Sequence, residues 1–93
     1  MSSLSHTFAI KGNRDWVIAK VINSIFVNLG ATSVPHPYDF YTAPGMYYYL
    51  DADNKVRMAT RFDKEIMERI VLSSPSEYYE MVRLMGNKSG QSL

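Results

Sequence analysis

The stretch MYYYLDADNKVRMATR, residues 46–61, predicts a β-hairpin around which the rest of the chain is arranged. Two short runs, residues 46–50 and 56–60, are rich in residue types that favour strands. Asp51, Asp53 and Asn54 lie between them and are turn-forming residues whose side chains bond readily to the local backbone. We therefore expect two antiparallel strands joined by a short turn.

The two faces of this hairpin differ in composition, because successive side chains of a strand point to opposite sides. The expected core-facing residues are Met46, Tyr48, Leu50, Val56 and Met58. The other face carries Tyr47, Tyr49, Arg57, Ala59 and Arg61. Aromatic rings bordered by cations suit the stacking of bases or of a nucleotide. The alternative is that the tyrosines pack against the long loop or a dimer mate, with the arginines shielding their edges.

The N-terminal part predicts a strand followed by a helix. HTFAIK, residues 6–11, alternates as a half-buried strand does, and it would place Lys11 on the same face as the outer tyrosines. Asn13 is expected to cap the following helix, while Asp15 complements its positive end. We expect this helix to span residues 14–29 and to stop at Gly30.

This helix has an apolar stripe and, on nearly the opposite side, a tryptophan. On a helical wheel the stripe consists of Ile18, Val21, Ile22, Ile25 and Leu29, with Phe26 at its border. Trp16 and Val27 fall together among polar residues. Trp16 either packs at the helix start against a loop or belongs to a contact patch for a second copy or a partner, since tryptophan is frequent at interface hot spots.

Residues 31–45, ATSVPHPYDFYTAPG, predict a long connection. Its three prolines each remove a backbone donor and favour extended geometry in the preceding residue, so we expect no regular element here. Loops of this length are usually functional or mobile. Tyr38, Phe40 and Tyr41 add aromatic rings close to those of the hairpin.

The C-terminal third predicts a short helix, a strand and a longer helix. Residues 62–72 fit both a helical and an extended pattern, and we expect a helical turn at residues 64–67 followed by a strand near residues 69–73. SPSE, residues 74–77, combines a capping box with a proline at the first helical position, which predicts a helix from Pro75. Its end is expected at Gly86 and Asn87, and its apolar stripe consists of Tyr78, Met81, Val82 and Met85.

Together these elements predict an α+β fold: a single domain over residues 1–93, with a small antiparallel sheet of three to four strands and two main helices on one face. Residues 1–5 and 87–93 are expected to be flexible. The opposite sheet face would be bare unless another chain covers it. Because a chain of 93 residues is also near the size at which folding alone becomes marginal, we expect a homo-oligomer.

Composition and charge narrow the classes of function. The net charge is only +1, so capture of a nucleic acid duplex through many phosphate contacts has no global electrostatic support. The absence of cysteine excludes disulfides and thiolate chemistry and fits a reducing compartment. The sequence contains neither an apolar run long enough to cross a bilayer nor a signal-peptide pattern, so we expect no membrane partner and a cytoplasmic location.

Motifs for catalysis or metal binding are lacking in the sequence. His6 and His36 do not have the spacing of joint metal ligands. The turn at residues 51–54 lacks the glycine and the glutamate of a calcium loop, and no phosphate-binding loop or nucleophile elbow occurs. His36 and Asp39 form a candidate acid–base pair without a neighbouring nucleophile. We therefore expect a protein that is not an enzyme and uses no cofactor.

The motifs along the chain follow the order Phe8-x-Ile10-Lys11, Asn28-Leu29-Gly30-Ala31, an aromatic loop, Tyr48-x-Leu50-Asp51, Asn54-Lys55-Val56 and a closing Ser-Pro-Ser-Glu helix. This order resembles that of the small accessory proteins encoded by bacteriophages. The resemblance implies a protein that binds and blocks a host factor, or that sequesters a nucleotide signal of host immunity, inside the host cell.

Three functions remain open from the sequence. The leading one is a non-enzymatic, phage-type protein that disables a host protein or a nucleotide immune signal. The second, less favoured, is a module that binds single-stranded nucleic acid through the tyrosine and arginine face, and the third is a small structural or assembly subunit. The expected contact residues are Trp16, Tyr38, Tyr41, Tyr47, Tyr49, Arg57 and Arg61.

Overall fold

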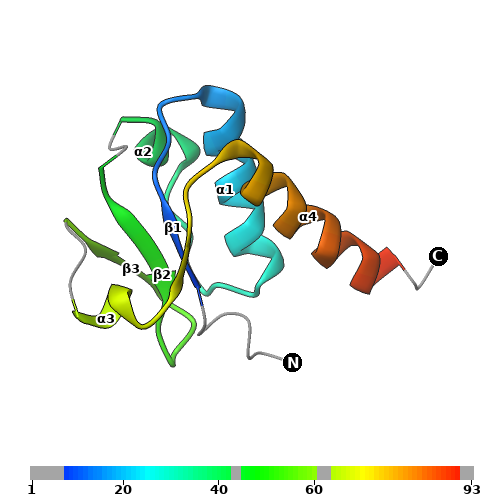
Figure 1. Cartoon of the computed structure of the whole chain (residues 1–93). Helices are drawn as coiled ribbons and strands as arrows, with labels where there is room; N and C mark the ends of the chain where they lie inside the picture. Colours follow the sequence, from blue (N-terminus) through cyan, green and yellow to red (C-terminus); the bar gives the residue numbers. More distant parts are fainter. Residues whose placement is uncertain (1–7, 43–44, 61–63, 91–93) are drawn as a thin grey trace.

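The computed structural model describes residues 8–42, 45–60 and 64–90, which form a four-stranded sheet with helices on both of its faces (Figure 1). The strand order is β3-β2-β1-β4. In chain order the elements are β1 (Phe8–Lys11), α1 (Trp16–Asn28), α2 (Pro37–Thr42), β2 (Tyr47–Leu50), β3 (Val56–Ala59), α3 (Lys64–Met67), β4 (Ile70–Leu72) and α4 (Pro75–Gly90). The predicted α+β class, with the two main helices α1 and α4 on one face, is confirmed.

The sheet is mixed, which differs from the antiparallel sheet expected from the sequence. β1, β2 and β3 pair antiparallel, but β4 pairs parallel with β1. Because the chain reverses its direction between β1 and β2 and again between β2 and β3, β3 runs in the same direction as β1. The connection that contains α3 then carries the chain back, so that β4 also runs in this direction. A parallel neighbour needs such a crossover connection, whereas a hairpin would have produced an antiparallel one.

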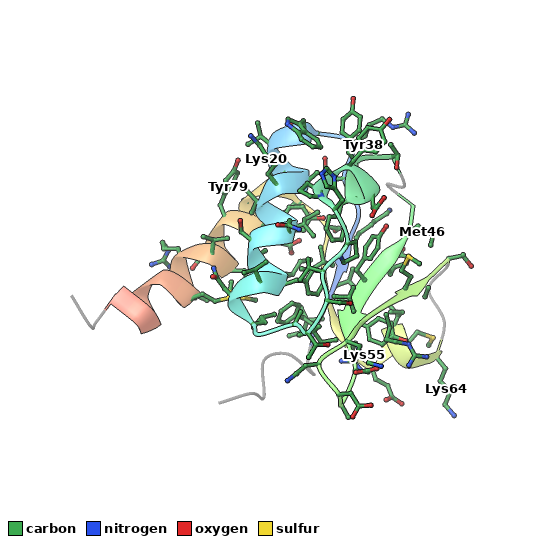
Figure 2. All side chains as sticks on the ribbon, turned by 180° about the vertical axis from the view of Figure 1, so that it is seen from behind. Lys20, Tyr38, Met46, Lys55, Lys64 and Tyr79 are labelled. Atoms are coloured by element: carbon green, nitrogen blue, oxygen red, sulfur yellow. The ribbon has the colours of Figure 1, made fainter. Side chains whose placement is uncertain are left out.

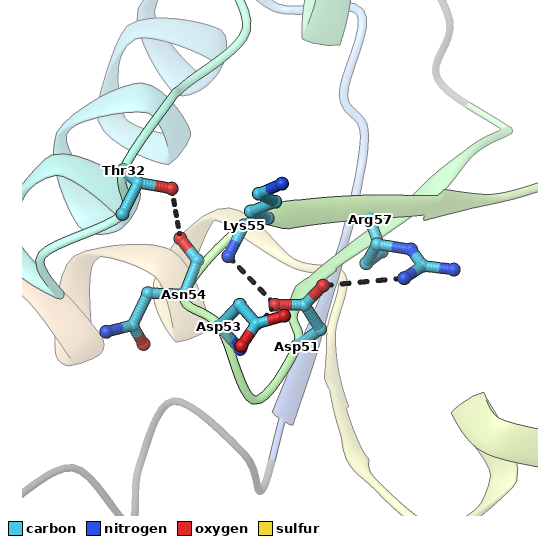
Figure 3. A network of polar contacts seen from close by, with 6 residues as sticks. All are labelled: Thr32, Asp51, Asp53, Asn54, Lys55 and Arg57. Atoms are coloured by element: carbon cyan, nitrogen blue, oxygen red, sulfur yellow. Dashed lines mark hydrogen bonds and ion pairs between the residues drawn. The ribbon is translucent and has the colours of Figure 1, made fainter.

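The predicted hairpin forms, and in it Tyr48 lies opposite Met58 and Tyr49 lies opposite Arg57. Its turn is held by the carboxylate of Asp51, as Figure 3 shows. Asp51 Oδ1 accepts hydrogen bonds from the backbone N–H groups of Asp53 (2.8 Å) and Lys55 (3.0 Å). The bond from Lys55 is the main reason why the pKa of the Asp51 carboxyl lies below its ordinary value. The aspartates of this loop thus serve the turn itself.

The helix α1 begins two residues later than expected, and its cap is Asp15 instead of Asn13. Asp15 Oδ1 accepts from Val17 N (2.9 Å) and Ile18 N (3.3 Å), because a carboxylate immediately before the first helical residue can reach the free N–H groups of the first turn. At the other end Gly30 adopts a φ of 83°, the left-handed conformation predicted for it.

The main core lies between the sheet and the helices. The predicted stripe of α1 is mostly buried, and Leu50 from β2 and Ile10 from β1 face it. α4 contributes Tyr78, whose hydroxyl donates a hydrogen bond to the carbonyl of Lys11 at the end of β1. Burial raises the pKa of the Tyr78 hydroxyl. This bond ties the last helix to the first strand.

The C-terminal elements agree with the sequence patterns, apart from the end of α4. The helical turn α3, the strand β4 and the start of α4 at Pro75 are confirmed. The capping box is also present, since Glu77 Oε1 accepts from the backbone N–H groups of Ser73 (2.8 Å) and Ser74 (3.1 Å). α4 continues to Gly90 instead of ending at Gly86, because a glycine permits the left-handed conformation of a helix end without requiring it.

Replacing Gly30 by alanine is expected to lower the free energy of unfolding by about 1 kcal/mol, because an L-residue is strained at this positive φ. A Cβ at Gly30 would meet no atom within 4 Å, so the cost is purely conformational. Gly45→Ala is the matched control, since its Cβ is equally unobstructed and its φ is not in this range. Urea denaturation measures both variants, and equal effects would contradict the conformational explanation.

The capping box predicts a pH dependence. The N–H groups of Ser73 and Ser74 lower the pKa of Glu77 below its ordinary value, so its ionised form stabilises the folded protein. This contribution is fully present above the unfolded pKa, roughly 4.3, and is lost as the pH falls through the folded pKa. Glu77→Gln should therefore lose less stability than the wild type between about pH 6 and pH 3. Thermal unfolding at several pH values measures this, and parallel curves for the two proteins would refute it.

Candidate functional site

The candidate site is built around α2, a helix in the segment for which the sequence analysis expected no regular element. That expectation is wrong because the residues around Pro37 form a helix cap. His36 Nδ1 accepts from Tyr38 N (3.0 Å), and Asp39 Oδ2 accepts from His36 N (3.2 Å). This reciprocal pair is a capping box with a histidine in the cap position, and Pro37 occupies the first helical position, where a proline costs no hydrogen bond.

Phe40 fixes α2 to the body of the protein. Its ring is fully buried, stacks on Phe26 of α1 at 6.0 Å between centroids, and meets Tyr48 of β2 edge-on at 4.6 Å. The preceding segment is held to α1 as well, because Asn23 Nδ2 donates to the carbonyl of Pro35 at 2.9 Å. α2 is thus held against both a helix and the sheet, and its remaining side chains form two surfaces on either side of Phe40.

The first surface is an aromatic patch consisting of Trp16, Tyr38 and Tyr41. The Trp16 ring meets Tyr41 edge-on at 5.9 Å, and Tyr38 lies 6.1 Å from Tyr41. Trp16 and Tyr38 remain 42% and 56% exposed. Lys20 lies one turn after Trp16, and its ammonium is 6.0 Å from the Trp16 ring centre. Figure 2 labels both Lys20 and Tyr38. The Trp16 ring therefore packs against the 31–45 segment, as the first interpretation expects, and it also presents surface to solvent.

The second surface is a cleft of about 410 Å³ between α2 and the strands β2 and β3. Its lining residues are Pro35, Asp39, Thr42, Met46, Tyr48 and Met58. Met58 was expected in the core but is 60% exposed. It has the predicted orientation, on the same face as Tyr48, but β3 is an edge strand and the helical layer does not extend over it. The same edge leaves the cleft open.

The opposite face of the sheet is not the open platform that the sequence suggested. The side-chain alternation is as predicted, but α3 closes over this face, and Ile66 packs with Ala9 and Tyr49 in a second small core. Tyr49 is only 5% exposed, with the Arg69 guanidinium 4.7 Å from its ring centre. The expectation that Tyr49 lies on a free surface is therefore wrong.

Tyr47 lies at the rim of this second core and is half-buried. The ammonium of Lys11 lies 5.9 Å from its ring centre, as expected for neighbours on paired strands. Arg57 donates from Nη1 to Asp51 Oδ2 at 3.4 Å, at the end of the hairpin (Figure 3). Arg61 lies outside the described residues.

The structure thus separates the predicted contact residues into two groups. Trp16, Tyr38 and Tyr41 come together, whereas Tyr47 and Tyr49 lie on the other face of the sheet. Lys20 beside the patch and the cleft itself are not predicted from the sequence. The HPYD motif at residues 36–39, with a proline at the first helical position and an acidic residue two positions later, was the local signal that would have revealed α2.

Clusters of metal-ligating side chains are not found in the described part of the chain. No set of three histidine, aspartate or glutamate side chains lies close enough there to hold a metal ion. The candidate acid–base pair His36 and Asp39 bonds to backbone N–H groups of its own helix. Among the described helices, none combines the length and apolar character needed to cross a membrane.

The chain matches no family model, and no curated protein and no solved structure is significantly similar to it.

The burial of Tyr49 predicts a structural role that a stability measurement can detect. Tyr49→Ala should lower the free energy of unfolding by about 3 kcal/mol, because it removes a ring from the second core. Tyr79→Ala is the control, since this tyrosine is 48% exposed on α4 and its loss should cost less than about 0.5 kcal/mol. Similar urea midpoints for Tyr49→Ala and the wild type would indicate that the ring is not a core residue.

Proposed function

We propose that this chain is a non-enzymatic binding protein whose aromatic patch docks onto a partner protein, in the manner of bacteriophage proteins that block a factor of their host. The observation that supports the proposal best is the connected set of rings of Trp16, Tyr41 and Tyr38, two of which are about half exposed. In this proposal the protein acts in the cytoplasm of the host cell.

The geometry of the patch favours protein binding for two reasons. Tryptophan and tyrosine are the residue types most enriched at interface hot spots, because they contribute a large contact area. Their rings are also held in place by one another and by α2, so binding would immobilise few additional side chains. The ordering of this surface therefore costs little of the free energy of binding.

The other partners considered from the sequence receive less support. A nucleotide or a single strand stacked on the tyrosine face would need open rings, but Tyr49 is buried under α3. Tyr47 with Lys11 is the remaining stacking position on that face. A homo-oligomer is compatible with the proposal, and light scattering of the pure protein measures the number of copies.

The test is an affinity capture from host lysate with the tagged full chain, in parallel with Trp16→Ala and Tyr38→Ala. We expect the wild type to retain a host protein that both variants retain at least about tenfold less, because each removes one hot-spot ring. Tyr79→Ala is the matched control, an exposed tyrosine outside the patch that should retain the partner fully. Circular dichroism verifies that each variant is folded.

Two results would count against the proposal. Equal retention of the same proteins by the patch variants would show that the aromatic patch is not the contact surface. Release of a nucleotide or an oligonucleotide on denaturation, without a host protein, would favour the alternatives. A Tyr47→Ala variant would then test the sheet face directly.

A further inference from the structure

We infer that the cleft between α2 and β3 accepts the side chain of an arginine or a lysine from the partner. This inference rests on the proposed function and deepens it, because it names the chemistry of the segment that the partner presents. The cleft and the aromatic patch are the two surfaces of the same short helix, so one partner can contact both.

The walls of the cleft suit an aliphatic stem. Pro35 before α2, Met46 before β2 and Met58 in β3 contribute apolar surface (Met46 is labelled in Figure 2). Methionine side chains are unbranched and polarisable, and they adapt to the shape of an inserted group. The three or four methylene groups of an arginine or lysine would be buried there, while the charged end reaches the polar part of the cleft.

The polar atoms of the cleft are mainly acceptors. Among the described residues that line the cleft, Asp39 is acidic and none is a cation. One oxygen of this carboxylate accepts from the N–H of His36, and a carboxylate accepts about four hydrogen bonds in all. Thr42 Oγ1 donates its proton to the carbonyl of Tyr38 at 3.0 Å, so this hydroxyl can serve a ligand only as an acceptor. Arginine and lysine carry only donors, which matches this lining.

The hydroxyl of Tyr48 adds no charge to the cleft. Its hydroxyl lies 3.5 Å from the Asp39 carbonyl oxygen, and burial together with the negative charge of Asp39 raises its pKa above the ordinary value. Tyr48 is therefore neutral at physiological pH, and among the described lining residues the carboxylate of Asp39 carries the formal charge. Phosphates and other anions would be repelled, which distinguishes this cleft from a nucleotide site.

The edge of β3 beyond Lys55, which itself forms an isolated parallel bridge with Ser33, gives the partner's backbone a place beside the cleft. Asp51 N donates to the carbonyl of Lys55 at 3.0 Å, which fixes the alternation of the β2–β3 ladder. In that alternation Arg57 bonds to Tyr49, and Met58 directs its own N–H and C=O away from β2. An extended segment could bond to this edge while its basic side chain enters the cleft, the mode of recognition known as strand addition.

The test is a nuclear magnetic resonance titration of the full chain, with methionine methyl groups labelled, using n-butylguanidinium as the probe. We expect the Met46 and Met58 signals to shift and saturate, with a dissociation constant on the order of millimolar for so small a ligand. Pentanoate, an anion of similar length, should produce no saturable shift. Asp39→Asn should weaken the guanidinium at least about tenfold, because it removes the charge but keeps an oxygen for the α2 cap.

Two further variants keep the test decisive. Asp53→Asn removes an exposed carboxylate in the hairpin turn, and this variant should bind the probe as the wild type does. Met58→Lys places the chain's own cation at the cleft and should abolish the saturable shift. Binding of pentanoate as strong as that of butylguanidinium, unchanged binding by Asp39→Asn, or no shift at Met58 would each overturn the inference.

The same titration separates this inference from the proposed function. Trp16→Ala should bind butylguanidinium normally while it loses the captured host protein. If butylguanidinium fails to bind but the patch variants still lose the partner, only the cleft inference is wrong. If it binds and no partner depends on the patch, the cleft remains a site for organic cations and the proposed function is wrong.

Discussion

The contact on which the other features depend is the packing of Phe40 between Phe26 and Tyr48. It joins three elements, α1, α2 and β2, through three rings that are almost completely buried. Six residues are too few to form a stable helix in water, because helix nucleation is costly. α2 therefore owes its stability to this packing and to its cap. Both the aromatic patch and the cleft take their shape from a helix that one buried ring holds in place.

The two faces of the sheet use aromatic residues differently. On the face toward α1 and α4, Tyr48 belongs to the large core. On the other face, Tyr49 is covered by α3 and by the Arg69 guanidinium, and Tyr47 lies beside Lys11. The cation–tyrosine contacts of this region thus belong to the packing of the folded protein. The exposed rings of Trp16 and Tyr38 lie at the start of α1 and on α2.

Local patterns in the sequence predicted most of the elements. The hairpin, the apolar stripe of α1, the capping box before α4 and the order of α3 and β4 all depend on residues that are close along the chain. The failures have tertiary causes. The alternation of the strands gave the correct side for Tyr49, but whether a helix covers that side depends on where the chain travels after β3. The same connection decides the direction of β4. In α2 the local cap outweighs the effect of the prolines, because Pro37 lies at the first helical position, where it interrupts no hydrogen bond.

The pairing of β1 with β4 joins residues that are far apart along the chain, since Phe8 lies opposite Ile70. Contacts that close so long a loop form late, because closing the loop costs chain entropy before the pairing contributes any stabilisation. On the ribosome, β1 can pair with β2 early, but its other edge stays open until β4 and much of the remaining chain have emerged. During synthesis the first strand therefore passes through a stage in which its outer edge is available to other strands, and only the arrival of β4 removes that risk of aggregation.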